Sequence, residues 1–182
     1  STIRSLALVD ASKVISYNRL KSAQFFIFVL LASAIRPKEE MKIAIINGPN
    51  LNLLGRREPA IYGDQGFDKV FDALRQRYPQ VTFRYSQSNI EGELVSIIQE
   101  AGSSSDGMVI NPGGYTHTSV AIADAIAATG VPVIEVHISN LISREEFRHT
   151  SLTGRYCRGT IMGLGIDGYR LAVEALIKIQ DK

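Results

Sequence analysis

Residues 47–63 combine side chains that could act together in acid–base catalysis. Tyr62 lies five positions after Arg57, and Asn50 precedes both in a segment that glycine and proline interrupt repeatedly. A phenol has a pKa of about 10, so Tyr62 could act as a base near neutral pH only if a charge such as that of Arg57 stabilised its anion. The alternative is an ordinary long connection in which the tyrosine ring only packs, and this segment alone does not separate the two.

A second polar cluster, residues 111–119, follows an apolar run and leads into a helical pattern. It carries Asn111 and His117 on either side of two glycines. The glycines would let backbone amides approach a ligand, and the N-terminus of the following helix favours an anion. The alternative is a plain turn between a strand and a helix, capped by Thr116 or Ser119, with His117 as a bystander.

A third cluster, residues 135–140, reads Glu-Val-His-Ile-Ser-Asn at the end of another apolar run. His137 could be a general acid whose tautomer Glu135 fixes, or a buried histidine that is satisfied within the core. Of the three histidines, His117 and His137 both fall in loops at the same predicted end of the sheet, which favours a shared site. We expect His149 to be structural, in a short helix that Ser143 caps.

From Met41 onward, apolar β-rich segments alternate with segments of helical period, which predicts an α/β fold with a parallel sheet. The predicted strands are residues 42–46, 81–86, 107–110, 131–136 and 159–162, and the main predicted helices are residues 67–78, 91–101, 119–128 and 169–180. Five strands with crossover helices on both faces form a flavodoxin-like three-layer α/β/α sandwich. Ligands in such sheets bind beyond the C-terminal ends of the strands, which is where the three polar clusters should meet. The 119–128 helix is apolar nearly all round, which predicts that it is buried in the core or against another subunit.

Composition narrows the class of protein. The 182 residues are 45% hydrophobic, which suits one buried core and a single domain. The formal charge is +2, but the first 40 residues hold six Lys or Arg against three Asp or Glu, so residues 41–182 carry −1 and no basic excess for nucleic acid. The lone cysteine, Cys157, allows no internal disulfide and no cysteine zinc cluster, and we expect an inert, partly buried thiol.

Residues 1–40 are predicted to lie outside the fold, with residues 41–182 as the single catalytic domain. Basic residues precede the apolar run 25–31, and residues 32–34 read Ala-Ser-Ala, so residues 1–34 could be a signal peptide for export. The run is too short to span a membrane. The alternative, which we favour, is a leader or upstream-derived extension ahead of Met41 on a cytoplasmic protein.

The three clusters, in this order, resemble the type II 3-dehydroquinate dehydratases, also called type II dehydroquinases. The resemblance rests on Gly-Pro-Asn-Leu-Asn with Gly-Arg-Arg-Glu-Pro and Tyr-Gly, on Asn-Pro-Gly-Gly-Tyr-Thr-His-Thr-Ser, and on Glu-Val-His-Ile-Ser-Asn with Arg-Glu-Glu-Phe-Arg. It covers essentially Met41 to the C-terminus. It implies a reversible trans-dehydration of 3-dehydroquinate to 3-dehydroshikimate in the shikimate pathway of aromatic amino-acid biosynthesis, without metal or cofactor.

The resemblance also implies a role for each motif residue. Tyr62, as a tyrosinate, would remove the proton, Arg57 would lower the pKa of that phenol, and His137 would protonate the departing hydroxyl. Asn50 would help to stabilise the enolate. The substrate-binding residues would be Asn111, His117, Ile138, Ser139, Arg148 and, from a neighbouring subunit, Asp124. That last role requires an oligomer, and the resemblance implies a homododecamer built as a tetramer of trimers.

Two other classes of protein compete with this interpretation. Residues 163–168 fit G-x-G-x-x-G, as in a dinucleotide-binding module, but they lie in the last strand–helix unit with no strand after it, so a tight turn is simpler. A non-catalytic scaffold that assembles through the 119–128 helix would keep the fold and lose the chemistry of Tyr62, Arg57 and His137.

Overall fold

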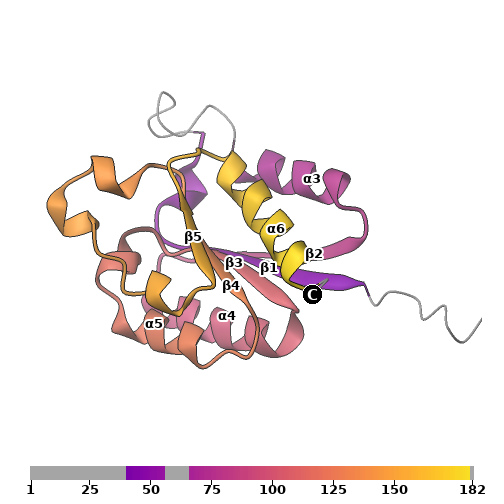
Figure 1. Ribbon diagram of the computed structural model, residues 1–182, viewed down its shortest axis with the longest axis horizontal. Helices are drawn as coiled ribbons and strands as arrows, with labels where there is room; N and C mark the ends of the chain where they lie inside the picture. Colours follow the sequence, from indigo (N-terminus) through magenta and orange to yellow (C-terminus); the bar gives the residue numbers. More distant parts are fainter. Residues whose placement is uncertain (1–39, 56–65, 181–182) are drawn as a thin grey trace, which may run out of the picture. The chain divides into compact units, whose positions relative to one another are not determined.

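The computed structural model describes residues 40–55 and 66–180 of the chain. Over these residues it has a five-stranded, all-parallel sheet in the order β2-β1-β3-β4-β5, with helices on both faces (Figure 1). The strands are β1 (Met41–Asn47), β2 (Val81–Gln87), β3 (Gly107–Asn111), β4 (Val133–His137) and β5 (Gly159–Met162), and the α-helices are α3 (Phe67–Arg77), α4 (Glu91–Ser104), α5 (Val120–Ala127) and α6 (Asp167–Gln180). The predicted flavodoxin-like α/β sandwich is confirmed.

Two hydrophobic cores, one on each face of the sheet, hold the three layers together. Ile43 and Ile45 of β1 belong to the core under α3 and α6, whereas Ala44 and Ile46 belong to the core over α4 and α5. The division arises because successive side chains of a strand point to opposite faces. Strands covered on both faces must be apolar throughout, and this is why the sequence runs of β1 and β3 are so uniform.

The predicted strands are confirmed to within two residues, and the differences at β1, β3 and β4 have physical causes. These strands end one residue later than predicted, at Asn47, Asn111 and His137, because the ladder continues through polar residues whose side chains are buried. β4 begins two residues later than predicted. Pro132 has no N–H to give to the ladder, so regular pairing starts at Val133.

The order of the strands places a crevice between β1 and β3. The chain passes from β1 to β2 on one side and then returns to β3 on the other, so the helices that follow β1 and β3, α3 and α5, pack on opposite faces of the sheet. The last residues of these two strands, Asn47 and Asn111, are partners in the sheet register. Crevices of this kind, outside the carboxyl ends of the strands, are the usual ligand sites of open α/β sheets.

Two predicted local features are wrong or only half confirmed. Ser143 does not cap a helix: it ends the 3₁₀ turn η3 (Leu141–Ser143), which the side chain of Asn140 caps instead, and a second turn, η4 (Glu146–Arg148), follows. Helix α5 is buried on one side only, and Val120, on its other side, is 62% exposed. Cover by another subunit remains a prediction.

The glycine motif before α6 is a tight turn, as predicted. Gly163 and Gly165 have φ angles of 82° and 60°, in the left-handed region that favours glycine. Their N–H groups donate to the carbonyls of His137 (3.2 Å) and Ile138 (3.0 Å), so the turn braces the end of β4. Over the described ranges, none of the helices combines the length and apolar character needed to cross a membrane.

Candidate active site

A cavity of about 310 Å³ lies at the C-terminal ends of β1, β3 and β4. Four stretches of chain line it: Pro49, Asn50, Leu51, Leu53 and Leu54 after β1; Asn111, Gly113, Gly114 and His117 from β3 and the turn after it; His137, Ile138, Ser139 and Leu141 from β4 and its loop; and Arg144 and Arg148 beyond. The structure therefore brings together Asn50, Asn111, His117, His137, Ile138, Ser139 and Arg148 of the predicted site residues. Arg57 and Tyr62 lie outside the described residues, and Asp124 is exposed on α5, away from the cavity of its own chain.

The loops after β1 and β3 are in direct backbone contact at Gly48. Its N–H donates to the carbonyl of Asn111 at 2.7 Å. A Cβ at this position would lie 2.5 Å from the carbonyl oxygen of Pro112 and 2.7 Å from its carbon, closer than atoms can approach. Both clashing atoms belong to backbone and cannot rotate away, so only glycine lets the two loops meet.

The Gly48→Ala variant should therefore separate the two loops, lowering kcat/KM at least tenfold and the free energy of unfolding by about 2 kcal/mol. Steady-state kinetics and urea unfolding at one protein concentration measure the two effects. Gly92→Ala is the matched control, because a Cβ at Gly92, on α4, meets no heavy atom within 4 Å. It should leave activity unchanged and raise stability by up to about 1 kcal/mol. Equal behaviour of the two variants would contradict the contact.

Asn50 is held in an unusual backbone conformation at the cavity wall. Its φ is 67°, in the left-handed region that asparagine tolerates better than most residues. Its N–H donates to the Oδ1 of Asn89 at 3.0 Å, and the same oxygen accepts from the Nε2 of Gln87 at 3.1 Å. The end of β2 and the residue Asn89 after it thus support the loop that carries Asn50, which lines the cavity.

His137 and Glu135 form a buried pair at the end of β4. The Nε2 of His137 lies 2.6 Å from the Oε1 of Glu135, and the two side chains are 5% and 0% exposed. An ionised carboxylate can only accept a hydrogen bond, so Nε2 carries a proton. The other ring nitrogen, Nδ1, has no partner among the described residues, and the ring lines the cavity. Nδ1 is therefore the atom that His137 can offer to a ligand, and the predicted link to Glu135 is confirmed.

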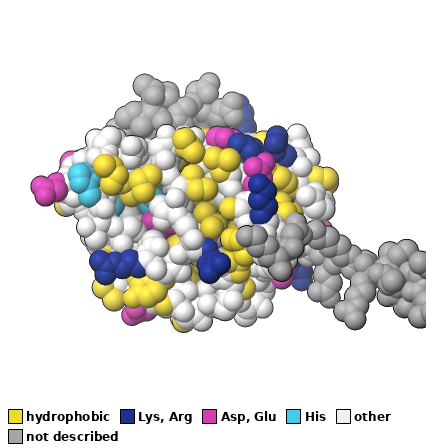
Figure 2. Space-filling view, viewed as in Figure 1, with side chains coloured by type: hydrophobic (Ala, Val, Ile, Leu, Met, Phe, Trp, Pro, Cys, Tyr) yellow, Lys and Arg dark blue, Asp and Glu magenta, His cyan; other side chains and the backbone are white. Residues whose placement is uncertain are grey.

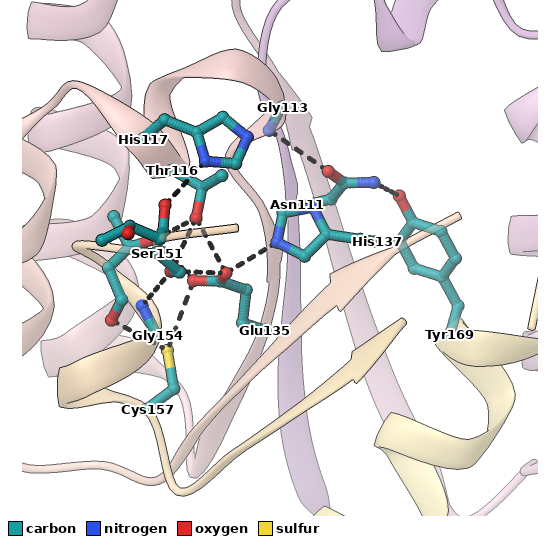
Figure 3. A network of polar contacts seen from close by, with 12 residues as sticks. Asn111, Gly113, Thr116, His117, Glu135, His137, Ser151, Gly154, Cys157 and Tyr169 are labelled. Atoms are coloured by element: carbon teal, nitrogen blue, oxygen red, sulfur yellow. Dashed lines mark hydrogen bonds and ion pairs between the residues drawn. The ribbon is translucent and has the colours of Figure 1, made fainter. Parts of the chain in front are cut away.

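Three hydroxyl groups surround the carboxylate of Glu135 (Figure 3). Thr116 Oγ1 and Ser151 Oγ donate to Oε1 at 2.9 and 3.0 Å, and Thr153 Oγ1 donates to Oε2. These hydroxyls come from the turn after β3 and from the segment before β5. A buried charge is stable only when it is paired and hydrogen-bonded, and this hydroxyl cradle supplies what His137 alone could not.

The cradle keeps Glu135 ionised. Burial by itself would raise the pKa of Glu135, but the hydrogen bond and charge of His137 and the hydroxyls of Thr153 and Thr116 outweigh it, so the pKa lies below its ordinary 4.5. A carboxylate whose pKa is lower in the folded state adds stability above its unfolded-state pKa, and that stability is lost as the pH falls through the folded-state value.

Thr153→Val should remove one donor from the cradle and raise the pKa of Glu135. We expect a loss of about 1–2 kcal/mol in the free energy of unfolding at pH 7, because a buried acceptor loses its partner. The loss should shrink as the pH falls below 4.5, where the wild type also loses the benefit of ionised Glu135. Urea unfolding between pH 7 and pH 3 measures it, with exposed Thr82, on β2, changed to Val as the control. A deficit that does not change with pH would show that Thr153 only packs.

Basic groups gather on one side of the cavity. The Nδ1 of His117 lies 2.8 Å from the carbonyl of Thr150, which can only accept, so its Nε2 is left for a ligand. Arg148 donates from Nε to Glu145 at 2.9 Å and lines the cavity together with Arg144. Two guanidinium groups beside a histidine suit an anionic ligand such as a carboxylate.

Several residues of the site were not expected from the sequence. Arg144 lines the cavity and precedes Arg148 by four positions, a spacing that could have indicated a shared side. Thr116 was considered only as a helix cap, but Ser119 caps α5, accepting from Ile122 N at 2.9 Å, and Thr116 is buried in the cradle. Nothing in the sequence links Glu135 to Ser151 and Thr153, because these contacts exist only once the segment before β5 has folded back.

Cys157 borders the cradle, with its Sγ 4.0 Å from the Oε2 of Glu135, and it does not line the cavity. It is partly buried, as predicted, and burial, followed by the charge of Glu135, raises the pKa of its thiol to about 12. The thiol therefore stays protonated at neutral pH. In the part of the chain that the structure describes, no group of three or more His, Cys, Asp or Glu side chains could hold a metal ion.

Comparison with known proteins gives a consistent result. The family model for dehydroquinase class II matches residues 41–177. The 3-dehydroquinate dehydratase of Fusobacterium nucleatum subsp. nucleatum is 51% identical over 148 residues, which cover 78% of this chain and 100% of that protein. The 3-dehydroquinate dehydratase of Helicobacter acinonychis is 48% identical over 144 residues, covering 76% and 86%. The solved structure of type II dehydroquinase from Butyrivibrio crossotus superposes with a TM-score of 0.73 at 46% identity, over 76% of this chain and 98% of that one.

Proposed function

The chain belongs to the class II dehydroquinase family, and from this premise we propose that it is a 3-dehydroquinate dehydratase of the shikimate pathway. The reaction is the reversible trans-dehydration of 3-dehydroquinate to 3-dehydroshikimate. The observation that carries the proposal is the cavity at the β1–β3 crevice, where His137, hydrogen-bonded to buried Glu135, faces the same space as Asn50, Asn111 and His117. An acid held beside a set of polar donors is what expulsion of a hydroxyl from a small polar ring requires.

The substrate is a small hydroxylated ring acid with a carboxylate. Arg148, Arg144 and His117 offer positive charge or N–H donors on one side of the cavity. The end of β4 adds the loop of Ile138 and Ser139, which we propose seats the carboxylate. Asn111, at the end of β3, would meet a ring hydroxyl. A volume of about 310 Å³ suits a ligand of this size.

The chemistry needs a base and an acid on separate loops. In the proposed mechanism Tyr62, as a phenolate stabilised by Arg57, takes the proton from the carbon beside the ketone and leaves an enolate, which Asn50 helps to stabilise. His137 then gives the proton on Nδ1 to the hydroxyl, which leaves as water while the enolate electrons form the new double bond. The proton taken by Tyr62 must return to His137 through solvent before the next turnover. The free Nδ1 and the ionised Glu135 support the role of His137.

Assembly is part of the proposal. Asp124 is exposed and does not line the cavity of its own chain, which fits a residue that completes the site of a neighbouring subunit in a homododecamer made of four trimers. Large hydrophobic side chains are also exposed, among them Val120 at 62% and Tyr156 at 52%, and hydrophobic groups lie between charged ones on the face in Figure 2. Light scattering tests the assembly, and a monomer with full activity would remove Asp124 from the site.

The activity is tested with purified protein and 3-dehydroquinate. We expect ultraviolet absorbance to rise as the conjugated enone of the product forms, at the same rate before and after treatment with a metal chelator. A flavodoxin-type binding module or a scaffold with the same fold would give no such signal. Absence of the absorbance change in folded, correctly assembled protein would contradict the proposed function.

The domain boundary and the cellular location are also part of the proposal. We propose that residues 1–40 lie outside the catalytic domain, residues 41–182, and that the enzyme acts in the cytoplasm on this one small-molecule substrate. The family match to residues 41–177 supports the division. Sequencing the N-terminus of the protein purified from its source would test it: a start within residues 35–40 would favour a cleaved signal peptide and export.

A further inference from the structure

A chain of three hydrogen bonds leads from the cavity wall into the core. The N–H of Gly113 donates to the Oδ1 of Asn111 at 3.2 Å, and the Nδ2 of Asn111 donates to the hydroxyl of Tyr169 at 3.0 Å (Figure 3). The hydroxyl of Tyr169 donates to the Oδ1 of Asn47 at 2.7 Å. Asn111 lines the cavity, whereas Tyr169 and Asn47 are fully buried beneath it. These three hydrogen bonds link β1, β3 and α6.

The donor-to-acceptor direction of these three hydrogen bonds is fixed by the N–H of Gly113. A backbone N–H can only donate, so Asn111 must turn its Oδ1 toward Gly113 and its Nδ2 toward Tyr169. The hydroxyl of Tyr169 then accepts from Asn111 and must place its own proton on Asn47. Burial, ahead of every other cause, raises the pKa of Tyr169 above its ordinary 10.0, so that proton is present at neutral pH.

An asparagine side chain needs such a restraint because its two ends have nearly the same shape. Turning the Asn111 amide over would exchange its donor and its acceptor with little change in volume. In this structure a reversed amide would set two donors against each other at Gly113. It would also deprive the Tyr169 hydroxyl, on a fully buried side chain, of the donor it accepts from.

We propose that Tyr169 and Asn47 are positioning residues that hold the Asn111 amide in one orientation for substrate recognition. The inference rests on the proposed function and deepens it. Each end of the amide makes one internal hydrogen bond, which leaves the second N–H of Nδ2 and the second lone pair of Oδ1. A ring hydroxyl of the substrate can accept a hydrogen bond from this N–H or donate one to this Oδ1 lone pair. The orientation of the amide decides which of the two groups the hydroxyl meets. Tyr169 would act on the substrate only through Asn111.

Tyr169→Phe tests this assignment, because it removes the hydroxyl and keeps the ring. We expect KM for 3-dehydroquinate to rise about five- to tenfold, the effect of losing one well-placed neutral hydrogen bond, with kcat changed less than KM. Tyr78→Phe is the matched control: Tyr78 is also buried in the core beneath α3 and α6 and donates to Glu174 at 2.8 Å, but it has no link to Asn111. It should lower the unfolding temperature without raising KM.

A double-mutant cycle separates positioning from general stability. In the Asn111→Ala background, Tyr169→Phe should have almost no further effect on kcat/KM, because its target is gone. Equal effects of Tyr169→Phe in both backgrounds would overturn the proposal, and so would an unchanged KM in the single variant. Activity of the wild type is measured in the same series, so loss of the proposed function itself would be seen separately.

Asn47→Leu provides a second route if Tyr169→Phe does not fold. This variant removes the Oδ1 that accepts from the Tyr169 hydroxyl. It also removes a buried Nδ2 that has no partner among the described residues, so it should lower the free energy of unfolding less than Tyr169→Phe does. We expect KM to rise in the same direction as in Tyr169→Phe. A folded Asn47→Leu variant with wild-type KM would also overturn the proposal.

Discussion

Replacing Tyr62 with phenylalanine is expected to lower kcat by about a thousandfold, within the range that a positioned general base contributes. The change keeps the ring and removes the only atom that could take the proton. Leu54, shortly before residues 56–65, lines the cavity, and the Cβ position of Gly66, just after them, lies 3.8 Å from the carbonyl oxygen of Leu54.

Steady-state kinetics of the enone absorbance should show the loss in kcat, with KM within about threefold of the wild type, because the ring would still occupy its place. Tyr156→Phe serves as the control, since Tyr156 is exposed on the 3₁₀ turn η5 (Gly154–Tyr156) and does not line the cavity. It should keep wild-type kinetics. If Tyr62→Phe retained more than a tenth of kcat, a different group would have to be the base.

His137→Gln is expected to have the second-largest effect, again a loss of about a thousandfold in kcat. Glutamine is chosen because its side-chain amide can still donate to the Oε1 of Glu135, as the Nε2 of His137 does at 2.6 Å. The buried carboxylate would keep a partner, so the fold should survive. What the variant loses is the proton on Nδ1, which no amide can supply.

His149→Gln is the matched control for His137→Gln. His149 is exposed, and its Nε2 contacts the carbonyl of Arg144 at 3.1 Å, outside the cavity lining. We expect its kcat to stay within about threefold of the wild type. Two outcomes would contradict the assigned acid: a large loss in His149→Gln, or more than a tenth of the wild-type kcat in His137→Gln once unfolding experiments have shown that the variant is folded.

The elements of the fold followed from local patterns that burial explains. A strand covered on both faces must be apolar, and a helix packed on one side must repeat its apolar residues with helical period, so both can be recognised along the chain. The polar ends of the strands were less predictable. Asn47, Asn111 and His137 continue their strands because neighbouring strands and distant side chains give them hydrogen-bond partners, and that information lies elsewhere in the sequence.

Of the two turns predicted from short-range residue patterns, one was correct and one was wrong. The glycine-rich turn before α6 was predicted correctly, since positive φ angles at Gly163 and Gly165 depend on those residues themselves. The expected cap at Ser143 was wrong, because the side chain of Asn140, three residues earlier, accepts from the N–H of Ile142 at 3.1 Å and forms the turn first. Which of these two residues caps the turn depends on the path of the chain after β4.

Residue types at short spacing were enough to predict the alternation of strands and helices, the order of the three polar clusters, and the motif residues Asn50, Asn111, His117 and His137. The contacts of Thr116, Ser151 and Thr153 with one carboxylate, and of Tyr169 with Asn111 and Asn47, could be found only in the folded chain. Those contacts join residues up to 122 positions apart. They form only where the sheet brings strand ends and the final helix together, and no short-range pattern records them.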